Sequence, residues 1–359
     1  MKIPVPDNIM SLIPYSRSKP GPETTPETSG TIRMSANENP LGPSPRAAEA
    51  IKNTLARLHF YPDLASRFLR QGLEKHLGVD AECIACGNGS YELLEFAVRT
   101  FVRTGDEVII GWPSFVVYRS LVRIAEGRLV EVPLKRFRYD IDALLSAVTD
   151  RTRMIILSCP NNPTGSILTA GEADVLLQGV PETALVIMDE AYCQFVRDPG
   201  YPDFIAYLQK HSNLLILRSF SKAYGLAGLR VGYGLGSREI MEVFDRVRQP
   251  FNINAAAQVG ALAALTDEQH LERTRILVHR GLDYLYDELR RMNLNFTPSE
   301  ANFILIDLGR PALPVVEGLR RDGIEVRAMG DYELPNCIRV SVGLQRENEI
   351  FIDSLKKLL

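Results

Sequence analysis

The chain has few cysteines, no long apolar stretch and no excess of positive charge, and each absence excludes a class of protein. Its 359 residues include five cysteines, an odd and small number, so we expect reduced thiols and no disulfide framework. The net charge is −3, which gives no indication of binding to nucleic acid or to an anionic membrane. No apolar run is long enough to span a bilayer.

The N-terminal residues do not have the basic and then apolar layout of a secretory signal peptide, because Pro4, Pro6 and Asp7 stand among them. We therefore expect a cytoplasmic protein. One closely spaced cysteine pair, Cys83 and Cys86, has the C-x-x-C form but no second pair. We interpret it as part of a buried strand, with a redox or metal role as the alternative, and expect no metal site.

Strand and helix patterns alternate along most of the chain. Short apolar runs bounded by turn residues predict strands at 83–86, 107–110, 128–133, 154–158, 185–189, 214–219 and 230–234. Helical patterns lie between several of them, at 91–102 and 169–177. Such alternation indicates βαβ units, so we predict an α/β fold with a mostly parallel central sheet flanked by helices.

A smaller α+β part is expected at the C-terminus. A long helical tract from about 255 to 292, broken near Thr266, leads into it. Its strands are predicted at 303–306, 324–327 and 337–342, and its helices near 314–321 and 348–358. We therefore predict an N-terminal arm (1–35), a large domain (36–250), and a linking helix with a small C-terminal domain (251–359).

Polar residues follow four of the expected parallel strands. They are the loop 87–90, the loop 161–165, Asp189, and the run 219–230, which contains Lys222. Ligands of open α/β sheets bind at the carboxyl ends of the strands. Because these clusters would meet at one edge of the sheet, the sequence predicts a ligand site there.

The run 219–230 indicates what this ligand is. A lysine becomes a useful nucleophile when it forms a Schiff base, and the serines Ser219 and Ser221 with Arg230 suit a phosphate. The N–H groups around Gly89 and Ser90 would form a second part of an anion site at a helix start. Together they predict pyridoxal phosphate held as an imine on Lys222. The alternatives are a surface loop with a solvated lysine, a plain strand–helix turn and a surface ion pair of Arg230.

Four further side chains suit the ring of that cofactor. Asp189 ends an apolar strand, and a buried carboxylate needs a partner such as a protonated pyridine nitrogen. Asn162 and Tyr192 could donate hydrogen bonds to the phenolate oxygen of the ring, and Phe115 could stack on its face. The alternatives are a helix N-cap for Asp189, a turn residue for Asn162 and a core aromatic for Phe115.

Arg339 is a charge within an otherwise apolar strand pattern, 337–342. Arginine is rarely buried without a partner. A bidentate grip on a substrate carboxylate would explain it, and a buried structural ion pair is the alternative. Arg327 ends the preceding expected strand and could reach the same cavity.

These residues, taken together, resemble the fold-type I enzymes that use pyridoxal phosphate, the aspartate aminotransferase superfamily. The resemblance runs from about residue 9 to the C-terminus, in family order. Its motifs are Ser35-Ala36-Asn37-Glu38-Asn39-Pro40-Leu41-Gly42-Pro43, Tyr61-Pro62-Asp63, Gly87-Asn88-Gly89-Ser90, Pro160-Asn161-Asn162-Pro163-Thr164-Gly165, Asp189-Glu190-Ala191-Tyr192, the run 219–230, Arg327, and Ile338-Arg339-Val340-Ser341-Val342-Gly343.

The resemblance implies roles for these residues. Lys222 would hold the cofactor and then act as general base and acid. Catalysis would also involve Asp189, Tyr192 and Asn162, and Phe115 would stack on the ring. The phosphate would be bound by Gly89, Ser90, Tyr91, Ser219, Ser221 and Arg230. Tyr61 would reach the phosphate of a neighbouring subunit, which implies a homodimer with shared sites. The substrate would be bound by Tyr15, Asn39, Arg327 and Arg339.

The resemblance further implies an aminotransferase of amino-acid biosynthesis, with histidinol phosphate and 2-oxoglutarate giving imidazole-acetol phosphate and glutamate. Two alternatives share the cofactor seat, an aromatic amino acid aminotransferase and a threonine-phosphate decarboxylase. A regulator that binds pyridoxal phosphate is a third, but the chain has no DNA-binding pattern. One departure lies in the arm, where Arg17-Ser18 replaces the family's Pro-Gly. This departure concerns how the arm closes over substrate and leaves the cofactor chemistry untouched.

Overall fold

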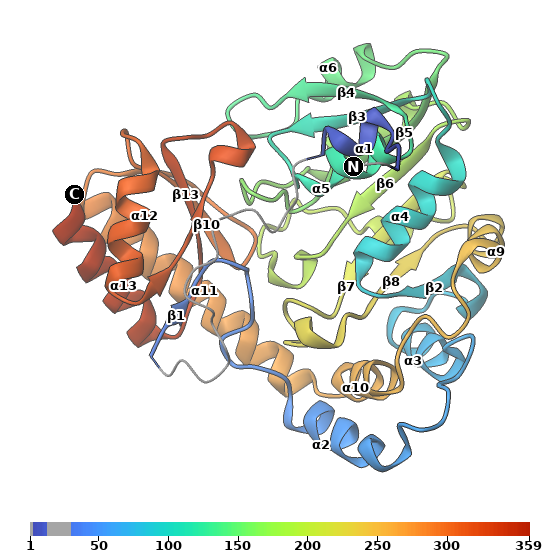
Figure 1. The fold of residues 1–359 in the computed structure, drawn as a ribbon, viewed down its shortest axis with the longest axis horizontal. Coiled ribbons are helices and arrows are strands. Elements are labelled where there is room, and N and C mark those ends of the chain that lie inside the picture. The colour runs from blue at the N-terminus through green and yellow to red at the C-terminus, as the bar shows by residue number, and fades with distance from the viewer. Residues whose placement is uncertain (1–2, 13–29) are drawn as a thin grey trace.

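The computed structural model describes residues 3–12 and 30–359. Its largest element is a seven-stranded sheet in the order β2-β8-β7-β6-β5-β3-β4 (Figure 1). The strands are β2 (Ile84–Gly87), β3 (Glu107–Trp112), β4 (Arg128–Pro133), β5 (Thr152–Ser158), β6 (Leu185–Asp189), β7 (Leu214–Ser219) and β8 (Gly232–Leu235). All pairs are parallel except those of β8, which runs antiparallel to β2 and β7. The predicted mostly parallel sheet is confirmed.

Helices cover both faces of this sheet. Alternate residues along β5 show the two-sided burial, because Ile155 belongs to one core cluster and Ile156 to the other. The first cluster includes residues of α3, α6, α7 and α10, and the second includes residues of α4, α5 and α9. Burial on both faces explains why the strands are nearly continuous apolar runs.

The helices that precede or surround the central sheet have the following bounds. They are α1 (Asp7–Met10), α2 (Pro45–Thr54), α3 (Arg67–Leu77), α4 (Ser90–Phe101), α5 (Val117–Ile124), α6 (Ile141–Ser146), α7 (Ala170–Gly179), α8 (Phe204–Tyr207) and α9 (Arg238–Val247). Short 3-10 turns lie at Leu55–Arg57, Ala81–Cys83, Cys193–Phe195 and Ala227–Leu229. Cys86 lies in β2 and Cys83 in the turn before it, and all five cysteines are free thiols.

The predicted long helical tract is two helices, α10 (Ala255–Leu265) and α11 (Glu268–Arg291). The break is at the expected place, where Asp267 accepts a hydrogen bond from the backbone N–H of His270 and caps α11. α10 packs on α2 and α3, and α11 continues to the C-terminal part (Figure 1). The domain limits expected from the sequence stay a prediction.

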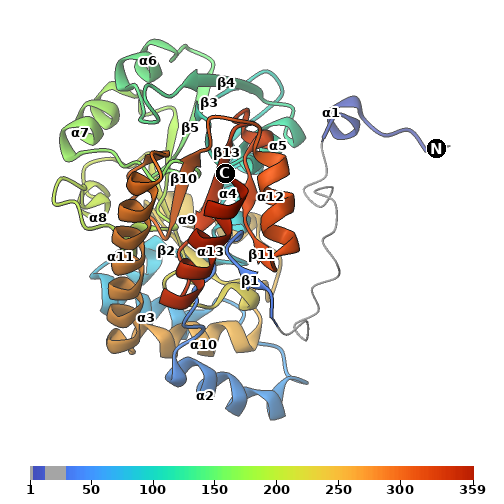
Figure 2. The same cartoon turned by 90° about the vertical axis from the view of Figure 1, so that its left-hand side faces the viewer.

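The C-terminal part is a four-stranded antiparallel sheet in the order β12-β13-β10-β9, here called the small sheet. Its strands are β9 (Asn295–Thr297), β10 (Phe303–Asp307), β12 (Arg327–Ala328) and β13 (Cys337–Ser341). Its outer face is covered by α11, α12 (Ala312–Arg321) and α13 (Gln345–Leu358), which stand in front of the strands in Figure 2. No helix of the described residues is long and apolar enough to cross a membrane.

One predicted strand, 324–327, is divided in the structure. β11 (Ile324–Glu325) pairs with β1 (Ile32–Arg33) near the N-terminus, whereas β12 pairs with β13 of the small sheet. The backbone therefore changes partner at Val326. The prediction of one continuous strand was wrong because β1 is too short for its pattern to be visible in the sequence.

Candidate active site

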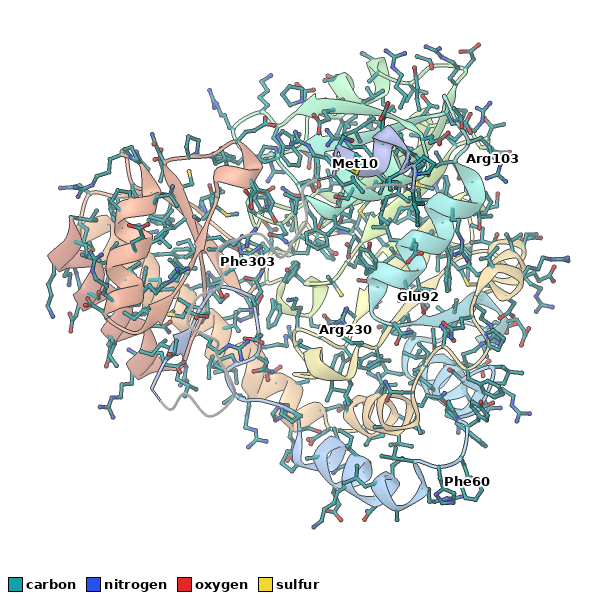
Figure 3. All side chains as sticks on the ribbon, viewed as in Figure 1. Met10, Phe60, Glu92, Arg103, Arg230 and Phe303 are labelled. Carbon is teal, nitrogen blue, oxygen red and sulfur yellow. The ribbon has the colours of Figure 1, made fainter. Side chains whose placement is uncertain are left out.

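The four polar clusters predicted at one sheet edge do lie together. β5, β6 and β7 are mutually parallel, and β2 runs in the same direction as β7 because both are antiparallel to β8. Their carboxyl ends therefore meet at one edge. The small sheet approaches this edge, since the ring of Phe303 on β10 lies 5.1 Å from the ring of Tyr192. Figure 3 labels Phe303 and Arg230 there.

Lys222 lies just beyond β7, and its side chain is partly exposed. Its Nζ donates a hydrogen bond of 2.9 Å to the carbonyl oxygen of Ala36 and lies 5.8 Å from the centre of the Tyr192 ring. Burial and then the positive charge of Arg339 lower the pKa of the Lys222 amine to about 8. The amine is thus partly neutral near neutral pH, as a nucleophile or general base must be.

Asp189 ends β6 and is buried with 7% of its surface exposed. Its Oδ2 accepts a 2.8 Å hydrogen bond from the hydroxyl of Tyr118, and its Oδ1 accepts one from the backbone N–H of Ala191. No helix begins at Asp189, so it is not an N-cap. Burial raises the pKa of its carboxyl to about 6. A cationic partner would stabilise this carboxylate, and a pyridinium nitrogen is such a partner.

Four of the residues expected to bind the phosphate form one cradle: Gly89, Ser219, Ser221 and Arg230. Gly89 has φ +74°, a conformation that favours glycine, and a Cβ there would lie 2.7 Å from Nη2 of Arg230. Nη1 of Arg230 donates to Oγ of Ser221 at 3.3 Å, and the backbone N–H of Ser221 donates to Oγ of Ser219 at 3.0 Å. α4 begins at Ser90 without a side-chain cap, which leaves its first N–H groups for an anion.

Arg339 lies on β13 and is buried. Its guanidinium donates to Oδ1 of Asn162 at 2.5 Å and to the carbonyl oxygen of Ser35 at 2.7 Å. Its Nε has no hydrogen-bond partner, and no carboxylate forms an ion pair with it, within residues 3–12 and 30–359. The alternative of a structural ion pair is therefore not what the described part of the chain contains. An anionic ligand would accept a hydrogen bond from this Nε and balance the charge of the guanidinium.

Arg327 lies directly opposite Arg339 in the β12–β13 pairing, so both side chains are on one face of the small sheet. Nη2 of Arg327 donates to Oδ2 of Asp331 at 2.9 Å. Two cations facing each other repel unless an anion lies between or near them. Asp331 is such an anion for Arg327, so binding of an anionic substrate by this pair of arginines stays a prediction.

Two residues of the site were missed by sequence reasoning. Tyr118 holds Asp189, as described above, and Asn37 donates from Nδ2 to the hydroxyl of Tyr192 at 2.9 Å. Asn37 is buried and has φ 56°, a left-handed conformation that asparagine tolerates better than most residues. The only sequence signals were a tyrosine three residues after Phe115 and an asparagine two residues before Asn39.

The remaining expected residues lie at the rim or away from the cluster. Phe115 is partly exposed and meets Tyr118 edge to face, with 5.7 Å between ring centres. Tyr91, in the first turn of α4, is 40% exposed. Tyr61 is 81% exposed and stacks on Phe251, 4.5 Å between ring centres.

Asn39 is engaged within the protein. Its Nδ2 donates to the carbonyl oxygen of Ala223 and to Oγ1 of Thr274, at 2.9 and 3.1 Å. Asn39 therefore ties the segment after β1 to the Lys222 run and to α11. Its substrate role stays a prediction. Tyr15, with the Arg17-Ser18 departure, lies outside the described residues.

The residues present fit pyridoxal phosphate. The cradle of Gly89, Ser221 and Arg230 suits a dianion, and the buried Asp189 suits a cationic ring nitrogen. Lys222 has a lowered pKa and lies within the same edge. No single feature is specific, but an amine, an anion cradle and a buried carboxylate in one site match the three ends of this cofactor.

Comparison with known proteins agrees with this geometry. Residues 29–355 match the family described as aminotransferase class I and II, so the chain belongs to the class I and II aminotransferases. It is 41% identical over 354 residues to a histidinol-phosphate aminotransferase of Moorella thermoacetica, with 98% of this chain and 92% of that protein covered. A histidinol-phosphate aminotransferase of Anaeromyxobacter sp. is 42% identical over 359 residues, with 99% of each covered.

A solved structure is also similar. The histidinol-phosphate aminotransferase from Sinorhizobium meliloti, in complex with pyridoxal-5'-phosphate, superposes with a TM-score of 0.87 at 32% sequence identity. The match covers 91% of this chain and 90% of that chain. The fold is thus that of the aminotransferases, with a large sheet and a small C-terminal sheet, as predicted.

Proposed function

We propose that this chain is the aminotransferase that converts histidinol phosphate and 2-oxoglutarate to imidazole-acetol phosphate and glutamate, a step of histidine biosynthesis. The observation that carries the proposal is the meeting of Lys222, Asp189 and Arg339 at one sheet edge. The curated relatives with this printed name match nearly the full chain at about 40% identity. The cofactor is pyridoxal phosphate.

We propose the following contacts between the protein and the cofactor. Asp189 would meet its ring nitrogen, and Phe115 its ring face. Asn162 and Tyr192 would meet its ring oxygen, and the phosphate would bind at Gly89, Ser90, Tyr91, Ser219, Ser221 and Arg230. When bound, pyridoxal phosphate supplies an electron sink for the bonds at the substrate's Cα.

Lys222 would move the proton in this reaction. With a pKa of about 8, its amine is partly neutral and can accept a proton from the Cα of the substrate. The positive charge of Arg339 contributes to that low pKa. The protonated amine can then return the proton on the product side, so one residue serves as both base and acid.

Arg339 and Arg327 would bind the anionic group of each substrate. Nε of Arg339 is buried without a partner among the described residues, and a carboxylate or phosphate would satisfy it. Both substrates carry such a group, and Asn39 and Tyr15 are proposed to contribute to substrate binding. The Arg327 and Arg339 pair thus accounts for two chemically different substrates in one site.

The experiment is a substrate panel with the purified protein. Histidinol phosphate with 2-oxoglutarate should give glutamate, and Lys222→Ala should lose at least about 10²–10⁴-fold of this rate. The matched control is Lys210→Ala, since Lys210 is exposed and precedes the N-terminal end of β7, whereas Lys222 follows the carboxyl end. Faster turnover of an aromatic amino acid, or release of carbon dioxide from threonine phosphate, would contradict the proposal.

We also propose a homodimer with shared active sites. The support is Tyr61, which is 81% exposed, together with the exposed apolar side chains near it in the chain, Leu55, Leu58, Phe60, Leu64 and Phe68. An exposed apolar patch of this kind is typical of an interface. Light scattering at micromolar concentration should give twice the chain mass, and a monomer would contradict the proposal.

We further propose a cytoplasmic location. The five free cysteines support it, since thiols remain reduced in that compartment. Fractionation of cells should place the protein with the cytosolic enzymes, and recovery with secreted proteins would contradict the proposal.

A further inference from the structure

Four side chains join the small sheet to the end of β3, and we call them the interdomain cluster: Trp112, Arg119, Tyr332 and Glu333. Trp112 ends β3, and Arg119 lies on α5 with its Cζ 3.2 Å from the centre of the Trp112 ring. The rings of Trp112 and Tyr332 are stacked, with centres 6.1 Å apart and planes 8° apart. The cluster thus spans both parts of the chain.

Glu333 makes the polar contacts of this cluster. Its Oε2 accepts a 3.1 Å hydrogen bond from Nε1 of Trp112, and its Oε1 accepts one of 2.9 Å from Nη2 of Arg119. Trp112 and Arg119 both belong to the part of the chain around the central sheet, and Glu333 belongs to the part around the small sheet. Glu333 therefore joins the two parts through both of its carboxylate oxygens. Glu333 ends the turn 330–332 with φ 62°, a left-handed conformation that glutamate rarely adopts.

The two sides of the cluster lead directly to the active site. On the small-sheet side, Asp331 of the same turn accepts from Arg327, which lies opposite Arg339. On the other side, Phe115 lies in the loop between β3 and α5, and Tyr118 of α5 donates a hydrogen bond to Asp189. The cluster therefore joins the residues proposed to hold the substrate anion to those proposed to hold the cofactor ring.

We propose that Glu333 is a positioning residue that holds the substrate-binding edge of the small sheet in register with the end of β3. The inference rests on the proposed function. A substrate that contacts Arg327 and Arg339 at one end and the cofactor at the other requires a defined distance between these arginines and the cofactor. Fixing that separation beforehand lowers the ordering cost of binding, so Glu333 acts on substrate affinity without touching the substrate.

The test is the Glu333→Gln variant of the holoenzyme, which keeps the size and removes the charge. KM for histidinol phosphate and for 2-oxoglutarate should rise about threefold to fivefold, the size expected for an ion pair whose Glu333 side chain is 66% exposed. The kcat should stay within about twofold. Trp112 is the only tryptophan of the chain, so its fluorescence reports on this contact. The emission should shift to longer wavelength without substrate, because water reaches the indole.

The matched control is Glu131→Gln. Glu131 on β4 accepts hydrogen bonds from the same Arg119, but both lie in the central-sheet part. This variant should keep the wild-type KM values. Wild-type KM or wild-type emission in Glu333→Gln would overturn the proposal, and so would an equal KM rise in Glu131→Gln.

The proposed function can fail separately from this inference. A wild-type protein that forms no glutamate from histidinol phosphate would refute the function. The emission comparison requires no substrate, so it would still decide whether Glu333 holds the two parts together.

Discussion

At the scale of single residues, the site depends on charges placed where water is largely excluded. Burial lowers the pKa of the Lys222 amine and raises the pKa of the Asp189 carboxyl. Burial thus favours the neutral form of both groups. The proposed role of Lys222 requires a neutral amine, and that of Asp189 requires a charged carboxylate. Neighbouring side chains then adjust these pKa values, and two predictions follow from which neighbour acts on which group.

The first prediction concerns Arg339 and the pKa of Lys222. A neutral amine is required to capture the cofactor aldehyde, so the rate at which apoprotein takes up pyridoxal phosphate should rise as the pH passes about 8. Arg339→Gln removes a positive charge that lowers this pKa, so the midpoint should move to higher pH. The measurement is the uptake rate from pH 6 to 10, by absorbance.

Arg327→Gln is the control for this prediction. It removes an equal charge from the opposite residue of the small sheet, but Arg339, and not Arg327, is among the main causes of the lowered pKa of Lys222. Its midpoint should equal that of the wild type. An unchanged midpoint in Arg339→Gln would show that the charge of Arg339 does not contribute to the low pKa of Lys222.

The second prediction concerns Tyr118 and the pKa of Asp189. The hydrogen bond from Tyr118 lowers the pKa of Asp189 and so opposes the effect of burial. Tyr118→Phe should raise that pKa further, and Asp189 should then lose its charge at a higher pH. The acidic limb of the kcat profile should move up by about one pH unit.

A buried tyrosine without this contact is the control. Tyr233 on β8 is buried, and its hydroxyl donates no hydrogen bond to Asp189. Tyr233→Phe therefore removes a buried hydroxyl without removing a contact of Asp189. Its acidic limb should coincide with that of the wild type. Equal shifts in both variants would mean that the profile responds to general loosening of the core.

At the scale of elements, the active site is shaped by close backbone approaches between segments. Gly225, in the Lys222 run, has φ +68°, and a Cβ there would lie 2.2 Å from the carbonyl oxygen of Gly42. The segment after β1 thus packs directly on the loop after β7, and Asn39 ties the two together. These contacts fix the position of Lys222 relative to the rest of the edge.

A glycine substitution tests this packing. Gly225→Ala combines a left-handed φ with the steric clash against Gly42, so the free energy of unfolding should fall by at least about 1–3 kcal/mol. The variant should also lose pyridoxal phosphate more readily on dialysis. Thermal unfolding and the absorbance of retained cofactor measure both effects.

Gly228 is the control in the same run, since a Cβ there meets no atom within 4 Å. Gly228→Ala should keep the wild-type stability and cofactor retention. If both variants retained the cofactor equally, the contact with Gly42 would have no part in holding the Lys222 run.

At the scale of the whole molecule, the proposed homodimer makes a prediction about mixed subunits. Tyr61 is exposed and stacks on Phe251, and we propose that it completes the phosphate site of the partner subunit. Lys222→Ala and Tyr61→Phe dimers should each be impaired. After subunit exchange, a mixed dimer contains one site with both Lys222 and Tyr61, so activity should recover.

Recovery distinguishes shared sites from separate ones. If Tyr61 acted within its own subunit, the mixed dimers would be no more active than the average of the two parent variants. The control is a mixture of Lys222→Ala with Lys210→Ala, in which only the fraction of intact Lys222 should determine the rate.

Much of the fold follows from local patterns in the sequence. Apolar runs predict the strands of the central sheet, and the rule that ligands bind at the carboxyl ends of strands predicts where the polar clusters meet. The shortest elements escaped prediction, as β1 and the division at Val326 show, because two-residue strands carry no periodicity. Candidate cofactor residues such as Lys222 and Asp189 were accessible to sequence reasoning, since Asp189 ends an apolar strand and Lys222 lies shortly after another.

The sequence by itself determined the fold class, the cofactor chemistry and the sheet edge at which Lys222 lies, because these depend on residues close together in the chain. Only the tertiary structure decided which side chains complete the site. Tyr118 and Asp189 are 71 residues apart, Asn37 and Tyr192 are 155 apart, and Trp112 and Glu333 are 221 apart. Such pairs leave no local pattern, since packing of distant elements alone brings a donor to its acceptor.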